Sequence, residues 1–212
     1  MADWVSSVPA ILDAFYPGQE GGHALTDILF GDVSPSGRLP LTFPKSWKDT
    51  PVHDSYPGRK EVAIYKEGIF VGYRYYDRKN SEPLFPFGYG LSYTTFAYSD
   101  LKIFPKTISQ KDTVQVQLRI TNTGKMAGDE VVQLYVHDVK ASLPREVKAL
   151  KGFVRVSLKP GESKWVTFKL NKKHLSFYDP NAKKWIAQPG WFEVLVGSSS
   201  RNVRLKGKFL LK

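Results

Sequence analysis

The second half of the chain alternates apolar and polar residues, which is the spacing of a half-buried β-strand because successive side chains point to opposite faces. The clearest run pairs apolar Val114, Val116, Leu118 and Ile120 with polar Gln115, Gln117 and Arg119. Further strands are predicted near residues 132–136, 149–158, 163–170, 191–196 and 203–210, with turns at 122–124, 160–161 and 189–190. About seven short strands at this spacing predict a fibronectin type III-like or immunoglobulin-like β-sandwich over residues 96–212.

Residues 1–45 carry a different pattern. An apolar run at residues 10–16, interrupted only by Asp13 and ended by Pro17 and Gly18, predicts a short buried strand. A glycine turn then leads into an amphipathic helix at residues 22–30, which ends at Gly31. A single strand–turn–helix unit cannot stand alone, because a parallel strand needs neighbouring strands and helices on its faces. We therefore expect an incomplete α/β segment.

Residues 46–95 join the two parts and are rich in proline, glycine and tyrosine, as at 71–77 and 85–93. Flexible linkers are poor in aromatic residues, so this composition predicts a connector packed over its neighbours. We expect little regular structure in it.

The net charge of +11 is concentrated in the second half. Residues 1–95 hold 9 Lys and Arg against 11 Asp and Glu, which leaves 22 against 9 in residues 96–212. The positive electrostatic field of such a segment favours acidic polysaccharide or nucleic acid as a binding partner. Because Lys164, Lys169 and Lys206 are scattered singly along the strands, we interpret the charge as a solvated sandwich surface and predict no nucleic-acid partner.

The chain has no cysteine, so disulfides and thiol chemistry are excluded. It has no apolar stretch of the roughly 20 residues that a membrane helix needs, and no visible export signal. The sequence indicates a soluble chain without a membrane partner. It leaves the compartment open between cytoplasm and secretion, depending on a missing N-terminus.

The first segment contains candidate phosphate-binding and catalytic residues. The turn at residues 18–22 has glycines before a helix, as in phosphate-binding loops, but Glu20 puts negative charge where phosphate would lie. We interpret it as a tight turn. A glycosidase needs two facing carboxyl groups, and the candidates in this region are Asp13, Glu20, Asp27 and Asp32. Each suits a turn or a helix position, so we interpret all four as structural.

Other candidate residues carry weaker signals. The histidines are His23, His53, His137 and His174, and their spacing predicts no metal site. Ser6, Ser36 and Ser92 lack the context of a hydrolase nucleophile. Tryptophans would stack on sugar rings if they shared one exposed face, and the candidates are Trp165, Trp185 and Trp191. Trp191 begins an alternating strand, which favours the sandwich core or rim.

Two motifs carry a family resemblance: Tyr-Pro-Gly-Gln-Glu-Gly-Gly at residues 16–22 and Gly-Arg-Leu-Pro-Leu-Thr-Phe-Pro at 37–44. Further segments match in the same order along the chain, at residues 29–32, 34–40, 67–69, 71–77, 85–96, 151–153 and 158–162. Together they resemble the C-terminal portion of a bacterial β-glucosidase of glycoside hydrolase family 3. The resemblance implies a TIM-like barrel, an α/β sandwich domain and a fibronectin type III-like domain, with residues 1–45 ending the second and residues 96–212 forming the third.

The resemblance also implies retaining, cofactor-free hydrolysis by an aspartate nucleophile and a glutamate acid/base. Ser99-Asp100 is the only Ser-Asp pair, but Leu101 follows it where the family has an aromatic residue, and it lies at the start of the sandwich. The family's glutamate precedes the turn at 16–22 by many residues, which places it before Met1, and Glu20 belongs to the turn. We therefore predict no catalytic, cofactor-binding or metal-binding residue in this chain.

The leading hypothesis is a C-terminal structural part of a retaining β-glycosidase that is inactive alone and takes β-glycosides only within the full enzyme. Its expected partners are the barrel and the α/β domain of the same enzyme, or a second copy through an apolar edge left at residues 10–30. The alternative hypothesis is a non-catalytic carbohydrate or cell-wall binding module that uses the basic sandwich. A standalone fibronectin-like adhesion module is disfavoured, because residues 1–45 would then have no purpose.

Overall fold

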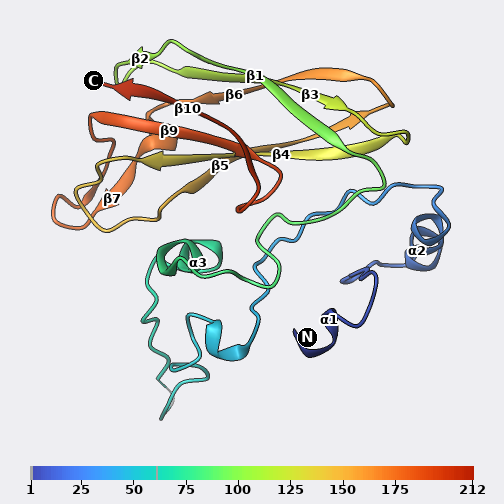
Figure 1. Cartoon of the computed structure of the whole chain (residues 1–212). Helices are drawn as coiled ribbons and strands as arrows, with labels where there is room; N and C mark the ends of the chain where they lie inside the picture. Colours follow the sequence, from blue (N-terminus) through green and yellow to red (C-terminus); the bar gives the residue numbers. More distant parts are fainter. Residues whose placement is uncertain (1, 61) are drawn as a thin grey trace.

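The computed structural model describes residues 2–60 and 62–212, and a two-sheet β-sandwich dominates it (Figure 1). The strands are β1 (Phe96–Phe104), β2 (Thr107–Ile108), β3 (Val114–Asn122), β4 (Gly128–Asp138), β5 (Ala149–Leu158), β6 (Ser163–Leu170), β7 (Phe177–Asp179), β8 (Lys184–Ile186), β9 (Gly190–Gly197) and β10 (Val203–Leu211). One sheet has the order β1-β3-β6 and the other β2-β10-β9-β4-β5. The predicted β-sandwich is confirmed.

The core lies between the two sheets and follows directly from the alternation in the sequence. Val114, Val116, Leu118 and Ile120 of β3 are all fully buried. They pack with apolar residues from β4, β9 and β10, including the stacked rings of Phe192 and Phe209, whose centroids are 5.7 Å apart. Every second residue of a strand therefore contributes to one continuous apolar layer.

Some sandwich elements were not read from the sequence. β1, the short β2 and the hairpin of β7 and β8 have weak alternation or too few residues to show a period. A helical turn, α4 (Lys172–Leu175), precedes the hairpin and begins at Asn171, whose side chain accepts a hydrogen bond from the Lys173 amide. β1 and β2 are edge strands of the two sheets, whereas β7 and β8 form a separate two-stranded sheet.

Residues 2–45 contain two helices, α1 (Ala2–Val5) and α2 (Gly21–Phe30). The helix predicted at residues 22–30 is confirmed, and Gly31 ends it with a φ of 84°, a conformation that glycine adopts at low cost. The strand predicted at residues 10–16 is wrong, since this segment runs without strand pairing in the structure. A strand forms only where a neighbour accepts its backbone hydrogen bonds, and the described residues provide none there.

The connector contains a 3₁₀ turn, η1 (Trp47–Asp49), and a helix, α3 (Tyr73–Lys79), and is otherwise irregular. The expectation of little regular structure missed α3, which lies against the sheet of β4 and β5 (Figure 1). Phe70 and Tyr76 are buried, so the connector packs with the sandwich at this end.

Candidate interdomain seam

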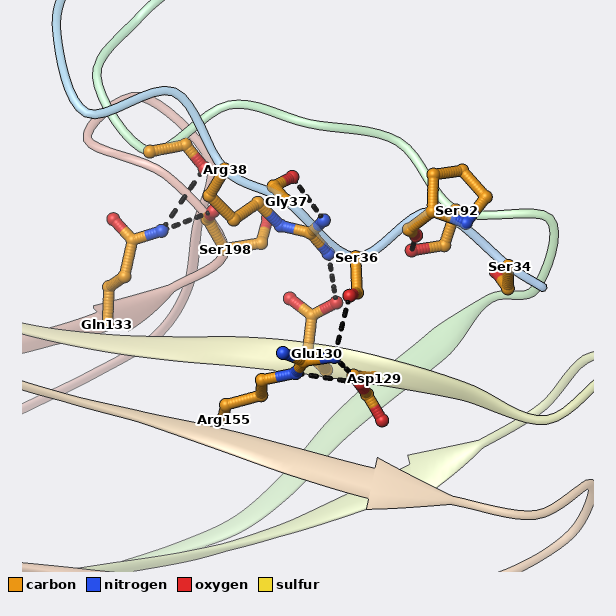
Figure 2. Close-up of polar contacts among 12 residues, drawn as sticks. Ser34, Ser36, Gly37, Arg38, Ser92, Asp129, Glu130, Gln133, Arg155 and Ser198 are labelled. Atoms are coloured by element: carbon orange, nitrogen blue, oxygen red, sulfur yellow. Dashed lines mark hydrogen bonds and ion pairs between the residues drawn. The ribbon is translucent and has the colours of Figure 1, made fainter. Parts of the chain in front are cut away.

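The best-defined polar site joins the segment at residues 34–39 to the sandwich. Arg38 Nη2 donates a hydrogen bond of 2.9 Å to Glu130 Oε2, and the Tyr98 hydroxyl donates one of 2.7 Å to Glu130 Oε1 (Figure 2). The side chains of Arg38 and Glu130 are only 7% and 4% exposed. Burial, followed by the negative charge of Glu130, raises the pKa of Tyr98 far above its usual range, so the phenol stays a donor. We call Arg38, Glu130 and Tyr98 the seam triad.

A second set of contacts flanks the seam triad. Arg155 of β5 donates from Nε to Asp129 Oδ2 at 2.7 Å and from Nη2 to the Ser36 hydroxyl at 3.0 Å (Figure 2). A hydrogen bond from Ser157 is the largest cause that lowers the pKa of Asp129, and Arg155 adds to it. The carboxylate thus remains charged between the two strands and helps to hold residue 36.

Backbone and hydroxyl groups complete the junction between the segment at 34–39 and the connector. The Leu39 amide donates to the Tyr89 carbonyl and the Gly88 amide donates to the Leu39 carbonyl, both at 2.8 Å. The Ser92 hydroxyl donates to the Pro35 carbonyl at 2.9 Å. The Tyr93 hydroxyl donates to the Ile28 carbonyl of α2 at 2.8 Å. The end of α2, the connector and the sandwich are therefore linked in one polar network.

Helix α3 is fixed to the same sheet by a separate buried cluster. Asp77 is 3% exposed, accepts a hydrogen bond from Lys148 Nζ, and lies 3.6 Å from Arg201 Nε. The Leu150 amide donates to the Tyr73 hydroxyl at 2.9 Å. Two cations around one buried carboxylate compensate its desolvation, so this contact holds the connector against β5.

An open cleft of about 250 Å³ lies beside the seam triad. Its polar lining includes Arg38, Glu130, Asn202 and Arg204. Within residues 2–60 and 62–212, no group of three or more His, Asp or Glu side chains is placed to hold a metal ion. The Arg38–Glu130 ion pair therefore lines the cleft, and the described residues supply no set of metal ligands there.

The four carboxylates considered from the sequence are all exposed. Asp13 Oδ1 accepts a hydrogen bond from the Phe15 amide at 3.0 Å, and Glu20 Oε2 lies 2.7 Å from His23 Nδ1 at the start of α2. Both contacts are local to a turn or a helix start, which suits the structural interpretation. Asp27 lies on α2 and Asp32 follows its end.

Ser99 and Asp100 lie in a bulge of β1 on the surface of the sandwich. The Ser99 hydroxyl donates to Asp100 Oδ2, and Arg119 Nε lies 2.8 Å from the same atom. Asp100 has a φ of 55°, a left-handed conformation that a bulge accommodates. The pair thus serves strand geometry and an ion pair.

The remaining sequence candidates are dispersed. His53 pairs with Asp54, His174 pairs with Asn171, and the half-buried His137 lies on β4 with its Nδ1 atom buried. Ser36 and Ser92 belong to the seam, and Ser6 lies in a turn beyond α1. Trp165 and Trp191 lie on different sheets, and Trp185 lies in the β7–β8 hairpin. The three tryptophans therefore do not share one binding face.

An apolar surface is exposed on the N-terminal side of the seam. Its members in residues 11–30 are Ile11, Leu12, Phe15, Tyr16, Leu29 and Phe30. Leu29 and Phe30, at the end of α2, are 70% and 82% exposed. Exposed apolar side chains gathered in one segment indicate an interaction surface. In the described part of the chain, no helix is long and apolar enough to span a membrane.

Comparison with known proteins shows which family has this architecture. Residues 1–73 match the glycosyl hydrolase family 3 C-terminal domain, and residues 130–200 match the fibronectin type III-like domain. Thermostable β-glucosidase B of Acetivibrio thermocellus is 50% identical over 203 residues, which are 96% of this chain and 27% of that protein. The chain belongs to glycoside hydrolase family 3.

Solved structures of the family agree with this assignment. The crystal structure of a Bifidobacterium adolescentis family 3 β-glucosidase matches with a TM-score of 0.94 and 40% identity, over 99% of this chain and 31% of that one. β-Glucosidase 3B of Thermotoga neapolitana, solved with glucose, matches with a TM-score of 0.92 and 41% identity, over 99% of this chain and 29% of that one. This family 3 chain therefore spans less than a third of these relatives, and corresponds to their C-terminal part.

The seam triad was not found from the sequence. Arg38 and Glu130 are 92 positions apart, so no local pattern shows that they form a pair. Two signals were available: Arg38 lies within the motif at residues 37–44, and Glu130 begins an alternating strand.

Proposed function

We propose that this family 3 chain is the C-terminal structural part of a retaining β-glucosidase-like enzyme that hydrolyses O-glycosyl bonds. Its role is to complete and stabilise the catalytic body, and the chain alone does not hydrolyse glycosides. We divide it into the end of an α/β domain at residues 1–45, a connector at 46–95 and a fibronectin type III-like domain at 96–212. The proposed partners are the barrel and the α/β domain of the same enzyme.

One observation carries this proposal: the apolar side chains of residues 11–30 are exposed, while the chain that follows them is joined to the sandwich by Arg38 and Glu130, and the end of α2 accepts a hydrogen bond from Tyr93. Burial of apolar surface contributes roughly 25 cal/mol per Å², so an exposed surface of this kind gains stability when a partner covers it. The arrangement supports a docking role within a larger enzyme.

The absence of catalysis is tested with the purified chain and an aryl β-glucoside. We expect release of the aryl alcohol at the rate of the blank. The Asp100→Ala variant serves as the control for the one Ser-Asp pair, and it should behave identically. Turnover above the blank would contradict the proposal: its loss in Asp100→Ala would assign catalysis to the Ser-Asp pair, and its persistence would require a catalytic pair elsewhere in the chain.

A further inference from the structure

The outer face of the β1-β3-β6 sheet is turned away from the seam. Figure 1 shows these three strands on the side of the sandwich opposite α3 and the N-terminal segment. The seam contacts and the α3 cluster involve mainly the other sheet, through β4, β5 and their adjoining loops. The exposed apolar side chains of residues 11–30 and the face of this sheet therefore lie on different sides of the sandwich.

The strand register shows which side chains share that face. The fully buried residues of β3 point into the core, so the residues between them point outward with their cross-strand partners. The outward rows are Phe104 with Gln115 and Lys169, Lys102 with Gln117 and Thr167, and Arg119 with Trp165. We call these eight residues the outer sheet face.

Two aromatic side chains stand at opposite corners of the outer sheet face. Trp165 is 49% exposed and Phe104 is 43% exposed. They are separated by two strands and four residues along the strands, a distance of about 17 Å from standard sheet spacings. Between them lie the amides of Gln115 and Gln117, and Gln117 Nε2 donates to the Thr167 hydroxyl at 3.3 Å. Apolar rings flanking neutral donors and acceptors match the alternating C–H faces and hydroxyls of several sugar residues.

The charge of the outer sheet face is positive. Arg119 Nε lies 2.8 Å from Asp100 Oδ2, which offsets its charge. Lys102 and Lys169 form no ion pair with any residue of the described chain. Lys102 Nζ lies over the Trp165 ring, 4.9 Å from its centre, so the cation and the aromatic ring are in direct contact. A carboxylate on a stacked sugar would meet this ammonium group.

We propose that the outer sheet face binds an extended polysaccharide that carries carboxylate groups, such as a uronic acid polymer. This goes beyond the structural role proposed above and does not depend on it. Nucleic acid fits less well, because phosphate backbones are held by many Lys and Arg contacts, whereas this face offers two uncompensated cations among neutral amides and hydroxyls.

The other sheet provides an internal comparison. Arg204, Lys206 and Lys208 form a basic row on β10, and Lys208 Nζ lies 4.9 Å from the Trp191 ring centre. Lys208 of β10 stands opposite Glu193 of β9. β10 pairs with β2 over only two residues, which leaves most of this edge of β10 unpaired. The lysines of β10 therefore suit the protection of a strand edge. Trp191 and Lys206 are therefore matched control positions of the same residue types.

The test is affinity electrophoresis of the full chain in gels containing polygalacturonate, with methyl-esterified polygalacturonate as the uncharged form of the same polymer. We expect retardation by the acidic polymer that weakens as salt rises, and little by the ester. Trp165→Ala should raise the dissociation constant by about tenfold, the loss of one stacked ring. The double variant Lys102→Gln/Lys169→Gln should raise it about two- to fivefold per charge, as expected for exposed charges.

Trp191→Ala and Lys206→Gln are the controls and should bind as the unchanged chain does. Circular dichroism melting of each variant establishes that it is folded, and the surface double variant keeps the test decisive if Trp165→Ala unfolds. The proposal is overturned if the unchanged chain is not retarded at low salt. It is equally overturned if Lys206→Gln weakens binding as much as the double variant, or if single-stranded DNA binds more tightly through the same residues.

Discussion

Replacement of Arg38 by methionine should destabilise the chain strongly. The change removes the 2.9 Å hydrogen bond and the only ion pair that the described residues give Glu130, whose side chain is 4% exposed. Breaking a buried pair by removal of one partner costs about 3–5 kcal/mol, because the other charge stays buried without compensation. The Tyr98 hydroxyl still donates to Glu130, so we expect the lower end, about 3 kcal/mol.

The double variant Arg38→Met/Glu130→Leu separates the lost pair from lost packing. Replacing both members of a buried pair with apolar residues of similar size is often neutral, so the double variant should recover most of the stability. The assay is urea unfolding followed by tryptophan fluorescence, with the free energy of unfolding obtained by linear extrapolation. A cost under about 1 kcal/mol for Arg38→Met, or a double variant no more stable than the single one, would refute the reasoning.

Three further outcomes are expected. A hydrogen bond from Ser157 is the first cause that holds the pKa of Asp129 below its usual value of 3.8. The contribution of this carboxylate to stability is therefore present above pH 3.8 and is lost as the pH falls through the lower folded pKa. Asp129→Asn should destabilise the chain at about pH 7 in urea unfolding, and the difference from the unchanged chain should disappear in strong acid. Leu29→Ser/Phe30→Ser should reduce self-association in light scattering without lowering the melting temperature, because both side chains are already exposed; unchanged association would show that another surface is responsible. Gly88 has a φ of 80° and an added methyl group would meet a glutamine of β4, so Gly88→Ala should cost about 1–3 kcal/mol in urea unfolding, and a neutral result would contradict the strain argument.

The sandwich could be predicted because its information is local. Every second residue from Val114 to Ile120 is apolar, and this alternation alone determines which face of β3 is buried. Helix α2 was equally readable from its apolar stripe and from Gly31. Where a segment's own period decides its burial, the sequence is sufficient.

The rest depended on contacts that a local pattern cannot show. Residues 10–16 look like a strand, but a strand needs a pairing partner, and the described residues supply none. Helix α3 lies between Gly72 and Asn80 in a tyrosine-rich stretch. Its buried Asp77 is paired with Lys148, which is 71 positions away in the sequence. The Arg38–Glu130 pair joins two segments 92 positions apart, so only the folded chain reveals it.

The most direct test of the account is a chimera in which this chain replaces the matched C-terminal region of the Acetivibrio thermocellus β-glucosidase B. The central claim is that the chain completes a catalytic body whose chemistry lies elsewhere. The account predicts that the chimera hydrolyses an aryl β-glucoside, whereas the truncated relative and the isolated chain do not. A folded, soluble chimera without activity, or a truncated relative as active as the chimera, would contradict it.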